Sequence, residues 1–290
     1  MAFHIGTNIR KRRLELGLTQ KELASDICTQ AQISNIEKGA LNPSSLVLFE
    51  LSKRLLVDMN YFFETNPVKS NEHFIEIKNM IKQLKAQRNY ASIKYIVDNE
   101  LTVNANRYAP YEHRYLLWHK GISLYHLTNN FEESVRLLKD LLVEENTASD
   151  KLLNINVKTS IATMYQSEKD YDKAYQLYKE VWNQLEEMEG IDDFETELKI
   201  LFGLSQTLTY LGEYNESKSY SLQAISICVK RNTLYMLPDS YYQTGNNLVK
   251  LNRKEEGLSY IQTAKTLFEI QGNTNMVNIV KGILEEHKSI

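Results

Sequence analysis

The sequence predicts an all-α protein, in which a small helix-turn-helix head precedes a right-handed solenoid of paired helices. Two observations lead to this fold class. Only 4 prolines and 11 glycines occur among 290 residues, so long stretches contain no helix breaker. One short residue pattern also recurs about every 41 residues through most of the chain, and such periods are typical of helical repeat proteins.

We place the head at residues 1–64, a linker at residues 65–72 and the repeat domain at residues 73–290. No apolar run approaches the ~20 residues needed to cross a bilayer, and the N-terminus lacks the features of a signal peptide. The two cysteines, Cys28 and Cys228, are too far apart in sequence to form a metal-binding motif. We therefore expect a cytoplasmic protein that has no membrane partner and keeps its thiols reduced.

The net charge of −3 does not by itself suggest a nucleic-acid partner. Residues 1–64 carry 8 Lys and Arg against 7 Asp and Glu, and four of these cations form the run from Arg10 to Arg13. The positive charge of the head is thus local and modest, and the interpretation of the head depends on its motifs.

The head shows the start and stop signals of four helices. Ile5, Ile9, Leu14 and Leu16 give a first helix an apolar pattern, and Gly17 can end it. A fourth helix begins after Asn42-Pro43-Ser44 and carries a leucine pattern at Leu46, Leu48, Leu51 and Leu55.

Two capping boxes mark the helices between them. In each, a threonine hydroxyl can accept from the backbone three residues on, while the side chain there reaches back to the threonine amide. Thr19 with Glu22 opens the second helix, and Thr29 with Gln32 opens the third, which runs to Gly39. Two short capped helices joined by a turn form a helix-turn-helix unit.

The head resembles the phage-repressor-like helix-turn-helix family in three segments that follow the family's order. They are Leu18-Thr19-Gln20-Lys21-Glu22-Leu23-Ala24, Ile33-Ser34-Asn35-Ile36-Glu37-Lys38-Gly39 and Asn42-Pro43-Ser44. The head departs from the family in the stretch from Ala24 to Glu37, which is one residue shorter than in the common pattern. Cys28 stands where the family usually has glycine. It either fills a tight turn or acts as a redox sensor beside the third helix.

This resemblance implies that the start of the third helix enters the major groove of DNA. Gln30, Ala31, Gln32 and Asn35 are then the base-reading candidates, with Gln30 suited to bidentate contact with adenine and Gln32 divided between base contact and capping. Phosphate contacts are expected from Arg10, Gln20 and Lys38. The resemblance also implies that Arg13 and Glu37 form an internal ion pair. The alternative is that the groove-facing residues are ordinary solvated residues of a helix surface.

The C-terminal part repeats an outline whose second residue falls at Tyr90, Phe131, Tyr171, Tyr214 and Lys254. In every copy but the first, a small residue follows three positions later. Another lies nine or ten positions earlier, at Gly121, Ala162, Ser205 and Gly245. We expect the small residues to bring the two helices of a hairpin close together, and the aromatic residue to fill the gap to the next hairpin.

These segments resemble five degenerate tetratricopeptide (TPR) repeats, and residues 273–290 would form a capping helix. In such repeats the first helix of each hairpin lines a concave face suited to extended peptides. Helical periodicity around the small residues then predicts the inward-facing residues of the last four repeats. The first repeat, which lacks a clear small residue, contributes one helical face that carries three lysines. The predicted inward-facing residues are Lys78, Lys82, Lys85, Tyr115, Trp118, Ile122, Tyr125, Asn156, Thr159, Thr163, Gln166, Lys199, Phe202, Gln206, Thr209, Asp239, Tyr242, Asn246 and Val249. Their amides, aromatic rings and lysines suit a peptide backbone, apolar side chains and a carboxylate.

A helix-turn-helix head directly before five TPR-like repeats resembles the PlcR-like peptide-sensing regulators of Gram-positive bacteria. The resemblance covers essentially the whole chain. It implies a homodimer that binds a two-fold operator and responds to a short signalling peptide in quorum sensing. Two alternatives stay open: repeats that serve only dimerisation or a protein partner, and a TPR adaptor or phosphatase.

No motif in the sequence indicates an enzyme or a cofactor. A P-loop, a Gly-rich dinucleotide loop and a nucleophile elbow are all missing. His119 and His126 share a helical face, but no carboxylate or thiol lies near them in sequence, so we expect no metal site.

Overall fold

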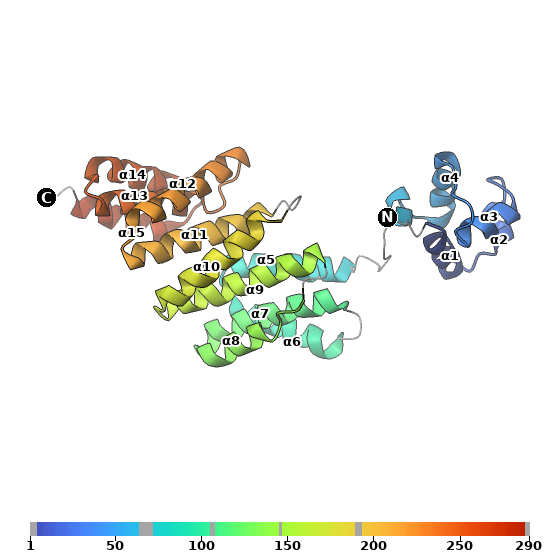
Figure 1. The fold of residues 1–290 in the computed structure, drawn as a ribbon, viewed down its shortest axis with the longest axis horizontal. Helices are drawn as coiled ribbons and strands as arrows, with labels where there is room; N and C mark the ends of the chain where they lie inside the picture. Colours follow the sequence, from blue (N-terminus) through green and yellow to red (C-terminus); the bar gives the residue numbers. More distant parts are fainter. Residues whose placement is uncertain (1–4, 64–71, 105–107, 145–146, 189–192, 288–290) are drawn as a thin grey trace. The chain divides into compact units, whose positions relative to one another are not determined.

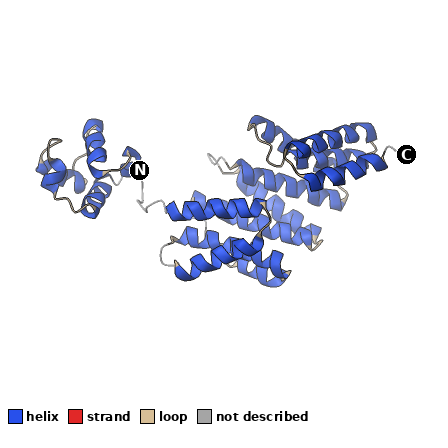
Figure 2. Cartoon of the chain, turned by 180° about the vertical axis from the view of Figure 1, so that it is seen from behind, coloured by secondary structure: helices blue, strands red, loops and turns tan. Residues whose placement is uncertain are grey.

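The structure is a computed structural model that describes residues 5–63, 72–104, 108–144, 147–188 and 193–287. All regular elements in these ranges are helical (Figure 2). The all-α prediction is therefore confirmed. The chain divides into two compact units, residues 1–79 and 80–290, with the division inside helix α5. Except for Glu72, the predicted linker lies outside the described residues.

Residues 5–63 of the head form four α-helices and one short 3-10 segment. They are α1 (Ile5–Glu15), α2 (Gln20–Ala24), α3 (Gln30–Glu37), α4 (Ser45–Leu55) and η1 (Met59–Phe63). Both predicted capping boxes are formed, at Thr19 with Glu22 and at Thr29 with Gln32. Their geometry fixes where α2 and α3 begin, and hence where the exposed start of α3 lies.

The apolar core of the head differs from the predicted pattern at two leucines. Leu14 is 59% exposed and Leu46 is 77% exposed, whereas Ile9, Leu51 and Leu55 are fully buried. The inner face of α1 is completed instead by Asn8 and Arg13, which are polar. A pattern of hydrophobic residues alone therefore missed part of the inner face of α1.

In the part of the repeat domain that the structure describes, the helices form five hairpins and one final helix. The hairpins are α5 (Glu72–Ala86) with α6 (Tyr90–Val103), α7 (Pro110–Thr128) with α8 (Phe131–Lys139), α9 (Ala148–Ser167) with α10 (Tyr171–Glu186), α11 (Phe194–Leu211) with α12 (Tyr214–Lys230), and α13 (Leu237–Lys250) with α14 (Lys254–Ile270); the final helix is α15 (Thr274–Glu286). Successive hairpins follow one another from α7 to α14 (Figure 1). The core of the fifth hairpin continues onto α15 through Val280 and Met276, as expected of a capping helix.

The recurring sequence outline marks the start of the second helix in every hairpin. Helices α6, α8, α10, α12 and α14 each begin at its second residue. In the fourth hairpin the Ser205 hydroxyl donates to the Ser217 carbonyl at 2.8 Å. In the fifth, a Cβ on Gly245 would lie 2.6 Å from the Gly257 carbonyl oxygen. The paired small residues therefore allow close helix contact, as predicted.

The aromatic residue at the start of the second helix reaches the next hairpin in three copies. The ring of Tyr90 stacks on His126 of α7, with ring centres 3.9 Å apart. The ring of Tyr171 stacks on Tyr210 of α11 at 4.6 Å. Phe131 meets Tyr165 of α9 edge to face at 5.1 Å. These contacts confirm the predicted role of the aromatic residue between hairpins.

Candidate DNA-binding face and ligand pocket

The start of α3 presents an exposed face. Gln30, Ala31, Gln32 and Asn35 are all exposed, while Ile33 of the same helix is fully buried against the head core. Packing thus fixes the rotation of α3, and it turns the predicted base-reading residues to solvent. This exposure is compatible with groove contact and does not test it.

Two of the predicted DNA contacts already have partners within the head. The Gln32 Oε1 accepts from the backbone amide of Thr29 at 2.9 Å, so this side chain serves the capping box. The Gln20 Nε2 donates to Glu37 Oε2 at 2.9 Å. Arg10 lies in α1 and Lys38 directly follows α3, and both cations are exposed. Gln30 and Asn35 are therefore the stronger candidates for reading bases.

A buried ion pair joins α1 to α3. The Arg13 guanidinium donates two hydrogen bonds to the Glu37 carboxylate, from Nε to Oε1 at 2.6 Å and from Nη2 to Oε2 at 3.0 Å. Its Nη1 donates to the Leu18 carbonyl at 2.8 Å. Burial raises the pKa of Glu37, but the hydrogen bonds from Arg13 and Gln20 outweigh it, so the net pKa lies below the ordinary carboxyl value. The Arg13 side chain thus bonds within the head and joins α1 to α3.

Cys28 packs partly buried against the head core in the turn before α3. Burial raises the pKa of its thiol. A raised pKa disfavours the thiolate, which is the form that oxidants attack. The environment of Cys28 therefore favours the turn-filling role over the redox role.

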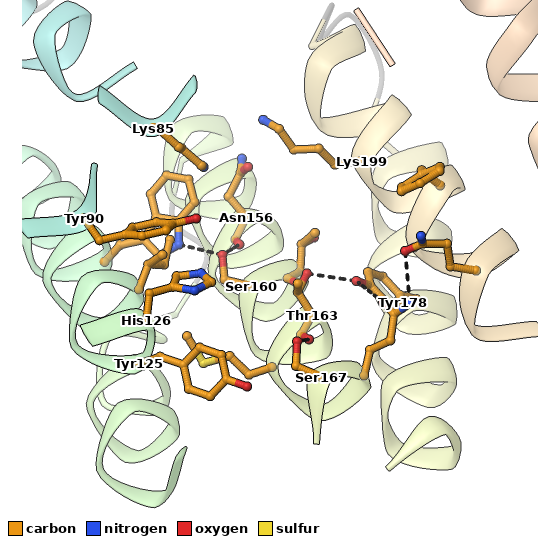
Figure 3. Close-up of a pocket in the computed structure, with 18 of the residues that line it drawn as sticks. Lys85, Tyr90, Tyr125, His126, Asn156, Ser160, Thr163, Ser167, Tyr178 and Lys199 are labelled. Carbon is orange, nitrogen blue, oxygen red and sulfur yellow. Dashed lines mark hydrogen bonds between the residues drawn. The ribbon is translucent and has the colours of Figure 1, made fainter. Parts of the chain in front are cut away.

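A cavity of about 320 Å³ lies on the face formed by the first helices of the hairpins (Figure 3). Its size is within the usual range of small-ligand pockets. The wall comes mainly from α7, α9 and α11, with single side chains from α5, α6 and α10. It is lined by Lys85, Tyr90, Trp118, Ile122, Tyr125, His126, Asn156, Thr159, Ser160, Thr163, Met164, Gln166, Ser167, Tyr178, Lys199, Phe202, Gly203, Gln206 and Met236.

Two lysines line one end of the cavity. Lys85 of α5 and Lys199 of α11 enter it from opposite walls (Figure 3), and no Asp or Glu is among the lining residues. Burial, aided by the charge of Lys199, lowers the pKa of Lys85 to about 8. Lys85 is therefore still mostly charged at pH 7. Burial likewise lowers the pKa of Lys199. Two partly desolvated lysines without a lining carboxylate favour an anionic group on the ligand.

An ion pair spans the space between α5 and α11 beside these lysines. The Lys82 Nζ lies 2.6 Å from Glu195 Oε1, although 113 residues separate them in sequence. The Lys82 side chain is 70% exposed, so solvent screens this pair. The predicted ligand lysine Lys82 is thus engaged with the protein itself.

Most of the predicted groove residues line the cavity. Those present are Lys85, Trp118, Ile122, Tyr125, Asn156, Thr159, Thr163, Gln166, Lys199, Phe202 and Gln206. Those outside it are Lys78, Lys82, Tyr115, Thr209, Asp239, Tyr242, Asn246 and Val249. Helix α13 contributes only the residue before its start, Met236, so the cavity does not extend along its predicted face.

Two of the residues outside the cavity have other roles. The Tyr115 ring packs edge to face on Trp118, with ring centres 5.6 Å apart. The Thr209 hydroxyl donates to Asn247 Oδ1 at 2.7 Å within a polar network between α11 and α13. Helical periodicity predicted that Tyr115 and Thr209 face the groove. In the structure they contact Trp118 and Asn247 instead of lining the cavity.

Sequence reasoning missed lining residues that come from outside the first helices. Tyr90 and Tyr178 belong to second helices and reach the cavity from behind. Tyr90 carried a signal, because it belongs to the recurring outline and its ring stacks on His126. Tyr178 carried none, since no periodicity predicts that a side chain of α10 crosses to the concave side.

Models of known protein families match both parts of the chain. The helix-turn-helix model matches residues 9–62. The model of the RNPP family C-terminal domain matches residues 78–289. The chain belongs to the RNPP family. The predicted resemblance to PlcR-like regulators is thereby confirmed.

The solved structures similar to this RNPP chain extend over nearly its full length. Bacillus thuringiensis PlcR in complex with the peptide PapR7 and DNA has a TM-score of 0.73 at 28% identity, covering 96% of this chain and 99% of that one. The apo form of the same PlcR has a TM-score of 0.68 at 25% identity, covering 97% and 99%. ComR from S. thermophilus, in complex with DNA and its signalling peptide ComS, shares the fold with a TM-score of 0.59 at 15% identity, covering 97% and 99%.

Curated relatives match a short part of the chain. An uncharacterized HTH-type transcriptional regulator of Sinorhizobium medicae is 37% identical over 65 residues, which is 22% of this chain. The chain spans about half the length of that relative, 47%. No helix in the described ranges is long and apolar enough to cross a membrane.

Proposed function

We propose that this RNPP protein is a transcription regulator that acts in the cytoplasm, binds DNA through α3 and binds a short signalling peptide in the cavity of its repeat domain. The observation that carries the proposal is the pairing of an exposed recognition helix with a concave cavity lined by amides, aromatic rings and two lysines. The similar PlcR structure holds a peptide and DNA, which supports the same two ligand classes here.

Replacing Gln30 and replacing Lys38 should weaken DNA binding in different ways. Gln30→Ala removes a side chain that can pair with a base edge, so we expect a loss of ~1–3 kcal/mol on one preferred sequence and little on random DNA. Lys38→Ala removes a phosphate contact, so binding to all sequences should weaken alike and the salt dependence should flatten. Fluorescence anisotropy with an operator selected from randomised DNA, repeated over salt, measures both. Equal losses for Gln30→Ala on selected and random DNA would contradict base reading.

We also expect two copies of the chain to bind one two-fold operator. The head carries few cations to hold DNA phosphates, so a single head should bind weakly. A dimer would place two heads on two half-sites. Sedimentation velocity at micromolar concentration, with and without operator DNA, measures the assembly. A monomer that binds an isolated half-site tightly would contradict the dimer.

The chemistry of the cavity favours an extended peptide with a carboxylate. Asn156, Gln166 and Gln206 offer side-chain amides for backbone groups, and Trp118 and Phe202 offer apolar contact. Lys85 and Lys199 offer positive charge to a carboxylate. This combination is typical of sites that bind peptide backbones along a groove.

Replacing both Asn156 and Gln206 by alanine should strongly weaken peptide binding. Both amides line the cavity, and each truncation removes hydrogen bonds worth ~0.5–1.5 kcal/mol to a ligand. A library of short synthetic peptides, tested by isothermal titration calorimetry, provides the ligand. C-terminal amidation of the best peptide should further weaken wild-type binding, because it removes a carboxylate from the lysine end.

A matched variant separates ligand contact from general disturbance. Gln176→Ala with Asn183→Ala removes two exposed amides of α10 that are outside the cavity. This control should bind peptide like the wild type, and both double variants should keep basal DNA binding. Unchanged peptide affinity in the Asn156/Gln206 variant would contradict the assignment of the cavity.

A further inference from the structure

A glycine in the cavity wall, Gly203, leaves space for the ring of Tyr178 from the neighbouring helix α10. Gly203 lies in the middle of α11, where glycine costs about 1 kcal/mol relative to alanine. A Cβ at this position would lie 2.3 Å from Cζ and 2.4 Å from Cε1 of Tyr178 in α10. The Tyr178 ring therefore occupies the space of the missing side chain. The tyrosine is only 2% exposed, yet it is one of the cavity residues.

The buried hydroxyl of Tyr178 orients a row of polar groups on the cavity floor (Figure 3). It lies 2.9 Å from Thr163 Oγ1 and 3.4 Å from Gln166 Oε1. A phenol carries one proton, and the Tyr178 hydroxyl gives it to Gln166 Oε1. Its oxygen in turn accepts the proton of the Thr163 hydroxyl, which also lies 3.0 Å from the carbonyl of Thr159. Because the Tyr178 proton needs an acceptor, the Gln166 amide turns its oxygen and not its nitrogen toward Tyr178.

The orientation passes from Gln166 to the next helix. With its oxygen facing Tyr178, Gln166 turns Nε2 toward α11 and donates to Gln206 Oε1 at 3.1 Å. This bond turns the oxygen of Gln206 toward Gln166. The Gln206 Nε2 has no hydrogen-bond partner among the residues that the structure describes, and Gln206 lines the cavity. The row therefore presents N–H donors, and not an acceptor, to a ligand.

We propose that Tyr178 is a positioning residue for ligand recognition: through Gln166 it holds the Gln206 amide so that its N–H groups bind a backbone carbonyl of an extended peptide. This inference rests on the proposed peptide-binding function. Without the Tyr178 hydroxyl, the two glutamine amides are free to reverse, and Gln206 then offers its oxygen as readily as its nitrogen. A carbonyl of the ligand would lose its donor in the reversed state.

The test uses Tyr178→Phe, which keeps the ring against Gly203 and removes only the hydroxyl. Tyr175→Phe is the matched control, because Tyr175 lies one turn earlier on α10 and is not a cavity residue. The probe is the best-binding peptide of the synthetic library, together with a series in which one backbone amide at a time is replaced by an ester. An ester carbonyl is a weaker acceptor, so the series locates the carbonyl that meets Gln206.

In the wild type and in Tyr175→Phe, one ester position should weaken binding about tenfold. Tyr178→Phe should bind the parent peptide about tenfold more weakly, and the ester at that same position should then cause little further loss. A merely structural role for Tyr178 would lower affinity without changing the effect of that one ester. Gln206→Glu, which replaces the N–H donors by an oxygen, should also remove the effect of this ester. Circular dichroism melting shows whether each variant stays folded.

Three results would overturn the inference. One is an unchanged affinity of Tyr178→Phe for the parent peptide. Another is an ester effect that adds fully to the effect of Tyr178→Phe at every position. If wild-type protein binds no peptide of the library, the proposed function fails and this inference fails with it. Binding to the wild type without the coupling contradicts the inference alone.

Discussion

Arg13→Ala is expected to unfold the helix-turn-helix head and to abolish DNA binding while the repeat domain stays folded. Arg13 and Glu37 are 7% and 8% exposed, and their bidentate pair joins α1 to α3. Removing one partner leaves a buried, uncompensated charge, which costs ~3–5 kcal/mol. That is comparable to the whole stability of a small domain. Circular dichroism melting should show loss of one transition, and anisotropy should show loss of operator binding.

Two further measurements distinguish an ion-pair effect from simple loss of a side chain. Replacing both Arg13 and Glu37 by methionine removes both charges, so much of the stability should return. The pair should also respond to acid. Because the pKa of Glu37 is lowered in the folded head, its contribution is complete above the ordinary carboxyl pKa of about 4.5 and is lost as pH falls through the lowered value. A head that melts normally as Arg13→Ala would contradict the structural role.

Gly245→Ala is expected to destabilise the repeat domain more than any exposed substitution in it. Helices α13 and α14 touch backbone to backbone at this point: a Cβ on Gly245 would lie 2.6 Å from the Gly257 oxygen, and one on Gly257 would lie 2.7 Å from the Gly245 oxygen. Backbone cannot move aside as a flexible side chain can. We expect a loss of ~1–3 kcal/mol or more in the free energy of unfolding, measured by urea denaturation of the repeat domain.

Gly282 provides the control for this substitution. It also lies in a helix, α15, but a Cβ there would meet nothing within 4 Å. Gly282→Ala should therefore stabilise the protein slightly, by up to ~1 kcal/mol, through its effect on helix propensity. Equal stabilisation by Gly245→Ala would show that α13 and α14 are not held in close contact.

Helix starts and the order of the repeats could be predicted because their signals are local. A capping box such as Thr29 with Gln32 satisfies amides within one turn, so four residues of sequence are enough to place it. The recurring outline placed the start of every second helix for the same reason. Exposure was less predictable: Leu46 fits the apolar pattern of α4, but no other element covers it, and it is 77% exposed.

The sequence by itself determined the two-part all-helical fold, the exposed start of α3 and most of the cavity wall, since each follows from helical periodicity over short distances. Only the tertiary structure decided where the cavity ends and which side chains of the second helices line it. The Lys82–Glu195 ion pair joins residues 113 positions apart. Tyr178 reaches the cavity only because α11 has no side chain at Gly203. Such contacts depend on how whole helices pack, and packing between distant segments leaves no periodic trace in the sequence.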